Sequence, residues 1–272
     1  MQCIISALKA ESLPLIQQFN LEKDSRFSFP VFHKDGLWLL GCGVGKKHIQ
    51  YRMTEFTNIV SDNKMQWINI GIAGGKKSTT FVGDAYLINK ILDGKTQKYY
   101  FPDLLVKHPF EEKSITTVES PVVDGGETFG ELVDMEASEI FKCFSKTGKT
   151  HRLAFIKIVS DYMDDNAQSL NRNDISHFIE SNIERLKLFL AHFQKLGDLD
   201  APILSTMDLD WVSSTSEKFS LTVTQRNQFA QIVKGFRLRH PNSQFPKIDL
   251  ELPKSKKEQK FKYQKICEDL TT

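Results

Sequence analysis

Two carboxylates stand where apolar runs typical of buried strands come to an end. Asp161 follows the mostly apolar run 153–159, and Glu11 follows the apolar run 2–8. In open α/β sheets, ligands bind outside the carboxyl ends of the strands, so both side chains are candidates for chemistry. Two carboxyl groups in different environments can divide the work of acid and base catalysis, one giving a proton and the other activating water.

Ordinary structural roles also explain these acidic residues. Ser160 and Asp161 are residue types that cap a following turn or helix. A glutamate such as Glu11 is stabilised by the helix dipole when it lies in the first turn of a helix. The same explanation applies to Glu136, which follows Met135 at the start of a predicted helix. On spacing alone, both the catalytic and the structural interpretation stay open.

Small residues follow two further predicted strands, 37–42 and 66–72. They are Gly43, Gly45, Ala73 and Gly74. Glycines between a strand and a helix let backbone amides approach a ligand, and small residues at a strand end leave room for a flat one. A tight turn needed only for packing would use the same glycines.

Apolar periodicity predicts an alternation of strands and helices along the first 200 residues or so. Strands are expected at 2–8, 29–33, 37–42, 66–72, 85–91, 98–101 and 153–159, with short extended segments at 113–118 and 121–123. Helices are expected at 10–19, 46–60, 132–141 and 174–196. This alternation is typical of an α/β fold with a largely parallel sheet.

The last part of the chain has a different pattern. Helices are expected around 207–212, 222–236 and 254–267, and Thr222 or Thr224 is expected to cap the second of them. Several lysines and arginines in this region permit a nucleic-acid-binding arm. A solvated helical extension explains the same charges. We therefore expect a domain over 1–197 and a helical C-terminal extension over 198–272.

The composition excludes several classes of protein. Hydrophobic residues make up 40% and charged residues 26% of the 272-residue chain, which is ordinary globular usage and not that of a disordered or fibrous protein. The formal net charge of +2 argues against a chain built mainly to bind nucleic acid. No signal peptide or membrane span is expected. The four cysteines, Cys3, Cys42, Cys143 and Cys267, predict buried thiols and a cytoplasmic location.

Several segments resemble, in order, the motifs of the nucleoside phosphorylase and nucleosidase superfamily, in particular its methylthioadenosine/S-adenosylhomocysteine nucleosidase branch. The segments are CIISALKAES, GCGVGKKHI, INIGIAGG, VGDAYLINKI, DMEASEIF and IKIVSDYMDD. The resemblance implies a three-layer α/β/α fold with a twisted mixed central sheet. It implies a homodimer that acts on a small nucleoside, with no metal or organic cofactor. The composition already argues against a membrane span and makes a nucleic-acid partner unlikely.

The resemblance also implies roles for individual residues. Asp161 would be the general acid that protonates the departing purine, and Glu11 would deprotonate the attacking water. Glu136 would hold the ribose hydroxyls, with Met135 packed against the sugar. The remaining matched positions are Ala73, Gly74 and Ser160 beside the base, and Gly43 and Gly45 in the glycine loop.

Three departures from the superfamily pattern bear on the reaction. The segment around Asn69 lacks the arginine that phosphorylases carry, and without that cation a phosphate dianion loses its clamp. Ile72 replaces a serine of the hydrolases, and Lys157 replaces an arginine. Hydrolysis of a purine nucleoside or a 5'-modified adenosine is therefore expected. A phosphorylase is the nearest alternative, and a nucleoside-binding regulatory protein with little turnover is the third.

Overall fold

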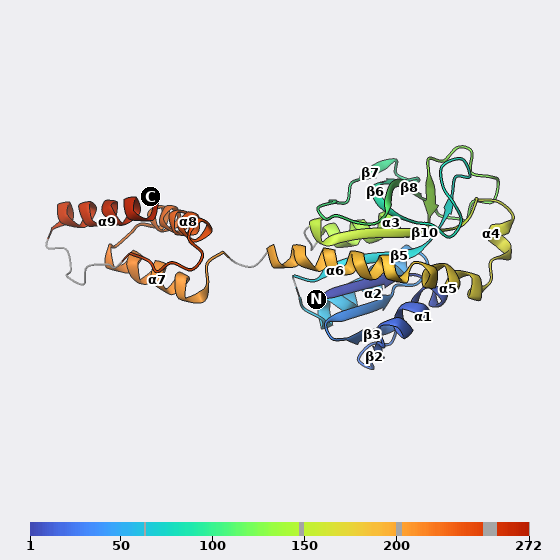
Figure 1. Cartoon of the computed structure of the whole chain (residues 1–272), viewed down its shortest axis with the longest axis horizontal. Coiled ribbons are helices and arrows are strands. Elements are labelled where there is room, and N and C mark those ends of the chain that lie inside the picture. Colours follow the sequence, from blue (N-terminus) through green and yellow to red (C-terminus); the bar gives the residue numbers. More distant parts are fainter. Residues whose placement is uncertain (63, 147–149, 200–202, 247–254, 272) are drawn as a thin grey trace. The chain divides into compact units, whose positions relative to one another are not determined.

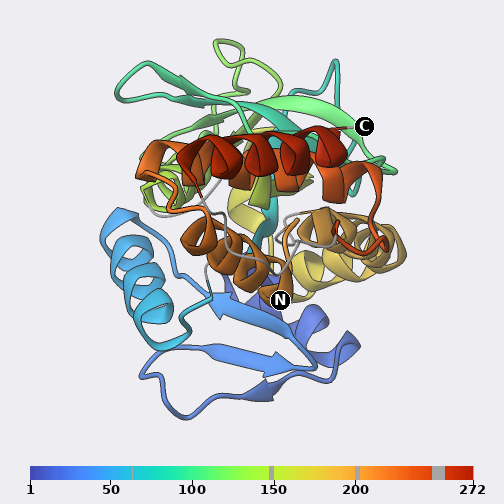
Figure 2. The same cartoon turned by 90° about the vertical axis from the view of Figure 1, so that its left-hand side faces the viewer.

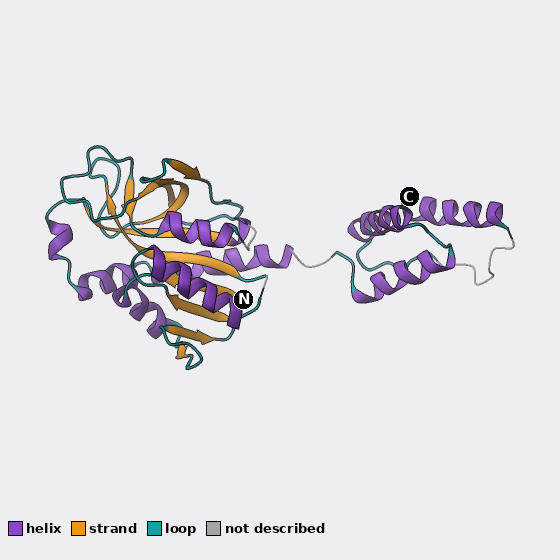
Figure 3. Cartoon of the chain, turned by 180° about the vertical axis from the view of Figure 1, so that it is seen from behind, coloured by secondary structure: helices purple, strands orange, loops and turns teal. Residues whose placement is uncertain are grey.

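The fold is described from a computed structural model of the chain, covering residues 1–62, 64–146, 150–199, 203–246 and 255–271. The chain divides into two compact units, Met1–Asp200 and Ala201–Thr272. The described strands all lie in the first unit, whereas the described residues of the second unit form helices joined by loops (Figure 3).

One mixed sheet runs through the first unit. Its described strands are β1 (Gln2–Ser6), β2 (Glu22–Lys23), β3 (Val31–Lys34), β4 (Leu37–Gly41), β5 (Gln66–Gly75), β6 (Ala85–Asp93), β7 (Lys98–Tyr100), β8 (Glu111–Thr117), β9 (Leu132–Asp134) and β10 (Leu153–Asp161). The helices are α1 (Lys9–Gln18), α2 (Lys46–Ile59), α3 (Ala137–Ser145), α4 (Asn166–Ser169), α5 (Arg172–Ser181) and α6 (Ile183–Leu199), with a 3₁₀ turn at Thr150–Arg152.

The long strand β5 organises the sheet. On one side it pairs in parallel with β10 from Trp67 to Gly74, and on the other side it pairs in parallel with β1. At Gly74 and Gly75, β9 takes the place of β1 as an antiparallel neighbour. Because β10, β6, β8 and β9 also pair in succession, these strands and β5 form a ring. Strands β4, β3 and β2 extend the sheet beyond β1.

Helices cover both faces of the sheet, as the three-layer α/β/α prediction requires. One apolar core includes side chains of α2 and α3, and the other includes side chains of α1, α5 and α6. Figure 1 labels these helices, and Figure 2 shows α2, in light blue, on the side of the sheet opposite to the yellow helices α5 and α6. The predicted fold class is confirmed.

Alternation along β10 decides which core each side chain enters. Leu153, Phe155 and Val159 pack in the core with α2 and α3, while Ile156 and Ile158 pack in the other. Successive side chains of a strand point to opposite faces, so the lysine in this run shares the face of α2 and α3.

Three sequence predictions differ from the structure. The predicted helix 132–141 is instead strand β9 followed by α3, because Leu132 and Val133 pair with neighbouring strands. The segment 121–123 is a loop rather than an extended strand. The predicted helix 174–196 is two helices that meet at Asn182, whose side-chain amide donates to the carbonyl oxygens of Gly83 (2.8 Å) and Phe178 (3.0 Å).

The cysteines also differ in part from prediction. Cys3 and Cys42 are buried, but Cys143 and Cys267 are partly exposed. All four are free thiols.

The second unit has an apolar core of its own. Its helices are α7 (Thr206–Lys218), α8 (Val223–Arg239) and α9 (Lys256–Thr271). Thr222 caps α8 by accepting a hydrogen bond from the backbone of Gln225, so one of the two predicted caps is confirmed. The guanidinium of Arg237 donates to both carboxylate oxygens of Asp208, which joins α8 to α7. Across the described residues of both units, no helix is long and apolar enough to cross a bilayer.

The core beneath α2 generates a stability prediction. The Phe56 ring is fully buried, and its centroid lies 5.4 Å from that of Trp67 and 5.5 Å from that of Trp38. Phe56→Ala should lower the free energy of unfolding by about 3–5 kcal/mol, because it leaves a cavity among these rings. Urea denaturation followed by tryptophan fluorescence measures it. Asn58→Ala, on the exposed face of α2, is the control and should cost about 0.5 kcal/mol or less. Equal losses for both variants would contradict the predicted packing.

Candidate active site

The carboxyl ends of β1, β5 and β10 open onto a cavity of about 230 Å³. The predicted catalytic, ribose and base residues all line this cavity: Glu11, Ala73, Gly74, Met135, Glu136, Ser160 and Asp161. Gly43 and Gly45 are not part of the lining, although Val44 between them is. The structure thus brings together residues that lie up to 150 positions apart in the sequence.

Asp161 is held at the end of β10 by its neighbours. The Ser160 hydroxyl donates to Asp161 Oδ2 (2.6 Å), and the backbone N–H of Met163 donates to Oδ1 (2.8 Å). Pairing between β10 and β5 shifts register between Val159 and Asp161, so the strand is irregular at this point. Bulges of this kind often re-aim a side chain beside a site. The Asp161 carboxylate is fixed in orientation while still facing the cavity.

Glu11 lies over β5 rather than pointing to solvent. Its Oε2 accepts hydrogen bonds from the backbone of Ala7 and Leu8 (2.8 Å each), and its Oε1 accepts one from Ile72 (2.9 Å). A Cβ placed on Gly71 would lie 2.8 Å from Glu11 Oε1, so glycine is required there for the carboxylate to fit. The interaction with the first turn of α1 and the position in the cavity therefore occur together, and the two interpretations of Glu11 do not exclude each other.

Burial changes the proton affinity of Glu11. Desolvation raises the pKa of its carboxyl above the ordinary value, while the three backbone N–H groups and Lys157 oppose that rise. A general base works best when its pKa approaches the pH at which it acts. Glu11 therefore combines a fixed position with a pKa that is raised toward neutrality.

Lys157 is the cation beneath this group of acids. It is 1% exposed, and its Nζ lies 2.8 Å from Asp134 Oδ2. Asp134 Oδ2 also accepts from the backbone N–H of Ala137 at the start of α3, and Asp134 Oδ1 accepts from the Thr117 hydroxyl, both at 2.8 Å. The ion pair therefore joins β10, β9, β8 and α3 at the wall of the cavity, which Asp134 lines.

The surrounding acids offset the effect of burial on the pKa of Lys157. Desolvation alone would lower the pKa of Lys157, but Asp134, Glu136 and Glu11 raise it above its ordinary value. Burial raises the pKa of Glu136 to about 7; the Lys157 ammonium opposes this shift, and the carboxylates of Asp134 and Glu11 add to it. One buried cation therefore faces three carboxyl groups, and their charges depend on one another.

The glycine loop contributes backbone shape. Gly43 and Gly45 have φ angles of +73° and +94°, which are strained for residues with side chains. This backbone turns the chain from β4 into α2 and leaves Val44 at the cavity wall.

Sequence analysis missed two important residues of the site. The motif comparison treats Lys157 only as a departure, and the sequence pattern does not single out Asp134. A lysine inside an otherwise apolar strand was the available signal, because a buried charge requires a partner. The sequence alone could not identify that partner as Asp134. No group of three or more His, Cys, Asp or Glu side chains in the described residues is arranged to hold a metal ion.

Similar proteins were found among solved structures alone. No protein-family model and no curated protein matches the chain. Among solved structures, an MTAN of Chlamydia trachomatis is 21% identical, with a TM-score of 0.56, over 70% of this chain and 98% of that one. A 5'-methylthioadenosine/S-adenosylhomocysteine nucleosidase of S. pneumoniae is 18% identical, with a TM-score of 0.57, over 72% and 100%.

The chain has a nucleosidase fold. A futalosine hydrolase of Helicobacter pylori has the same fold, at 12% identity and a TM-score of 0.59, over 70% of this chain and 98% of that one. These nearly complete matches to the other proteins leave almost a third of this chain outside the nucleosidase fold.

The Lys157–Asp134 pair gives a prediction about stability. Lys157→Met removes the cation but keeps an unbranched chain of similar length, and should lower the free energy of unfolding by about 3–5 kcal/mol because Asp134 loses its buried partner. Lys157→Arg keeps the charge and should lose clearly less. Urea denaturation of both variants measures the difference. A methionine variant as stable as the native protein would show that the pair does not support the fold.

Glu136 gives a prediction about pH. Its pKa is about 7 in the folded chain against an ordinary 4.5, so between these pH values the unfolded chain holds fewer protons than the folded one. Its contribution to stability should therefore fall as pH rises through this window, by up to about 1.4 kcal/mol per pH unit. Urea denaturation between pH 4.5 and 8 should give a flatter profile for Glu136→Gln than for the native protein. The exposed Glu180→Gln is the control, and identical slopes for all three proteins would rule out this assignment.

Proposed function

We propose that this protein is an N-ribosyl hydrolase that cleaves the glycosidic bond of a purine nucleoside or a 5'-modified adenosine, such as methylthioadenosine or S-adenosylhomocysteine. The observation that carries the proposal is the convergence of Asp161, Glu11 and Glu136 on one cavity at the strand ends. The nucleosidase fold supports it, since neighbours of that fold are named as nucleosidases.

The reaction develops positive charge on the ribose and negative charge on the departing base. Asp161 donates a proton or a hydrogen bond to the base, and Ser160 orients that carboxyl group. Glu11 takes a proton from the water that attacks the sugar carbon, while Glu136 holds the ribose hydroxyls beside Met135. Each proton-transfer group contributes about 10²- to 10⁴-fold to the rate. Ala73 and Gly74 provide a flat wall for the base.

The charge of the cavity favours water over phosphate as the nucleophile. Its charged lining residues are all acids, namely Glu11, Asp134, Glu136 and Asp161, and the described lining includes no lysine, arginine or histidine. A phosphate dianion in this cavity would meet carboxylates without a cationic clamp. Neutral water meets no such penalty.

Ile72 favours a second candidate function, that of a nucleoside-binding regulatory protein. It lines the cavity, and its side chain brings no hydroxyl to the site. A nucleoside-binding regulatory protein with little turnover would retain the same base and ribose contacts. Assembly as a homodimer, a cytoplasmic location, no binding of nucleic acid, and a separate extension at 198–272 stay predictions.

Base release from a panel of nucleosides tests the proposal. Methylthioadenosine, S-adenosylhomocysteine, adenosine and inosine are each incubated with and without phosphate. Asp161→Asn and Glu11→Gln should each slow release by about 10²- to 10⁴-fold, because each removes one proton-transfer group. Asp84→Asn, which changes an exposed carboxylate outside the cavity lining, should behave as the native protein does.

The outcomes separate the three functions. Phosphate-independent release that both site variants suppress supports the hydrolase. Release that requires phosphate would make the protein a phosphorylase. Binding of nucleosides without release under any condition would make it a regulatory protein.

A further inference from the structure

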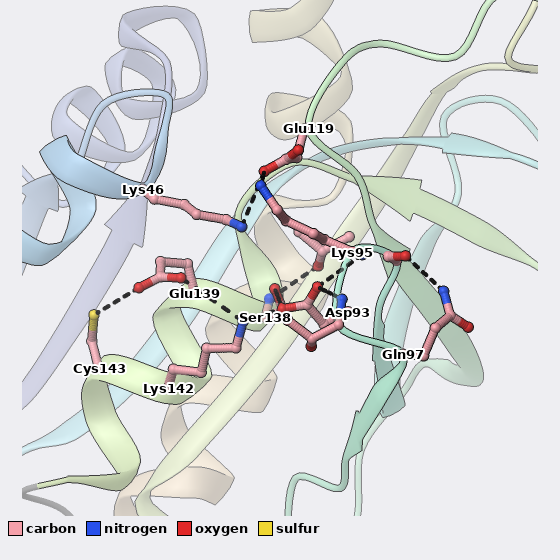
Figure 4. A network of polar contacts seen from close by, with 12 residues as sticks. Lys46, Asp93, Lys95, Gln97, Glu119, Ser138, Glu139, Lys142 and Cys143 are labelled. Carbon is pink, nitrogen blue, oxygen red and sulfur yellow. Dashed lines mark hydrogen bonds and ion pairs between the residues drawn. The ribbon is translucent and has the colours of Figure 1, made fainter.

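Two lysines and one glutamate meet beside the cavity, from three separate parts of the chain. Lys46 begins α2, two residues after the cavity residue Val44, and Glu119 directly follows the cavity residue Val118. Lys95 lies in the turn between β6 and β7. In Figure 4 the two ammonium groups point at the Glu119 carboxylate from different sides.

A single carboxylate oxygen is shared by both cations. Glu119 Oε1 lies 2.9 Å from Lys95 Nζ and 3.4 Å from Lys46 Nζ. The nearby Asp93 is engaged elsewhere, because it pairs with Lys142 and accepts hydrogen bonds from the backbone of Lys95 and Thr96. Among the described side chains, Glu119 is therefore the carboxylate that both lysines contact, while Asp93 acts on Lys95 from a greater distance.

The two lysines of this cluster can exchange one carboxylate partner for another, and their ion pairs contribute little to the stability of the fold. The side chains of Lys46, Lys95 and Glu119 are 38%, 61% and 54% exposed. Exposed ion pairs contribute little to folding, so another carboxylate can replace Glu119 at little cost. The charged residues that line the cavity are all acids, which disfavours a negatively charged part of a ligand inside it.

The proposed binding mode directs one part of the nucleoside toward this cluster. With the base at Asp161 and the ribose hydroxyls at Glu136, the 5' carbon is the remaining point of attachment. Val44 and Val118 line the cavity and lie within two residues of Lys46 and Glu119, which pair with each other. A 5' substituent that extends along this wall would therefore reach the two side chains.

We infer that Lys46 and Lys95 form a carboxylate subsite at the rim of the cavity, which Glu119 fills in the free protein and which receives the acidic end of a 5' substituent. The inference rests on the proposed function and narrows it: the preferred substrates are nucleosides whose 5' group ends in a carboxylate. The carboxylate of Glu119 already shows that the position accepts this group.

Binding of a matched pair of ligands tests the subsite. Both carry a 5'-carboxyalkylthio group on a 9-deazaadenosine scaffold, whose carbon–carbon bond to ribose resists hydrolysis; one is the free acid and the other its methyl ester. Isothermal titration with the full chain gives the affinity ratio of acid to ester. Lys46→Met and Lys95→Met should each lower this ratio by about two- to fivefold, as expected for an exposed ion pair.

Glu119→Gln should raise the same ratio, because it removes the carboxylate that competes for the lysines. Lys98→Met, an exposed lysine on β7, is the matched control and should leave the ratio unchanged. A ratio that is the same in all of these proteins would overturn the subsite while leaving the nucleosidase proposal in place. Failure of both ligands to bind the native protein would overturn the proposed function, and the subsite with it.

Discussion

A buried ion pair between Lys157 and Asp134 underlies the rest of the site. A lysine that is 1% exposed needs a partner at hydrogen-bond distance, and Asp134 provides one at 2.8 Å. The same aspartate holds the start of α3 and the end of β8, so the charges and the backbone are fixed together. Asp134 and Ala137 flank Glu136, so the pair fixes the backbone segment that carries Glu136 against β10. The ion pair thus links the elements around the cavity, and its lysine also influences the pKa values of Glu11 and Glu136.

Charge is distributed unevenly between the cavity, whose charged lining residues are acids, and its rim, which carries Lys46 and Lys95. Acids line the interior. Burial raises the pKa of Glu11 and of Glu136, the carboxylates of Asp134 and Glu11 add to the rise at Glu136, and Lys157 opposes the rise at both residues. That environment suits proton transfer to and from neutral groups such as a purine, ribose hydroxyls and water. Cations outside the cavity, at Lys46 and Lys95, suit an acidic substituent. In the proposed binding mode, the interior and the rim contact different parts of one ligand.

The sequence was sufficient for the fold class and for most elements, because apolar periodicity and strand-end residues are local signals. It failed where pairing across the chain decided the structure. Leu132 and Val133 have a helix-compatible pattern but lie in a strand, since β5 and β8 both offer partners. The break at Asn182 interrupts a continuous apolar stripe through contacts with Gly83, about 100 residues away. The Lys157–Asp134 and Lys46–Glu119 pairs likewise depend on long-range packing that no local pattern encodes.

The most direct test of the central claim follows the oxygen atom of water. If Glu11 activates water for attack on the sugar, a reaction run in ¹⁸O-labelled water should place the label on the anomeric carbon of the released ribose. Mass spectrometry of the quenched products before anomeric exchange would show it. A labelled sugar and an unlabelled base are the predicted result. An unlabelled sugar, or a sugar phosphate formed when phosphate is present, would contradict the account of this cavity as a water-activating site.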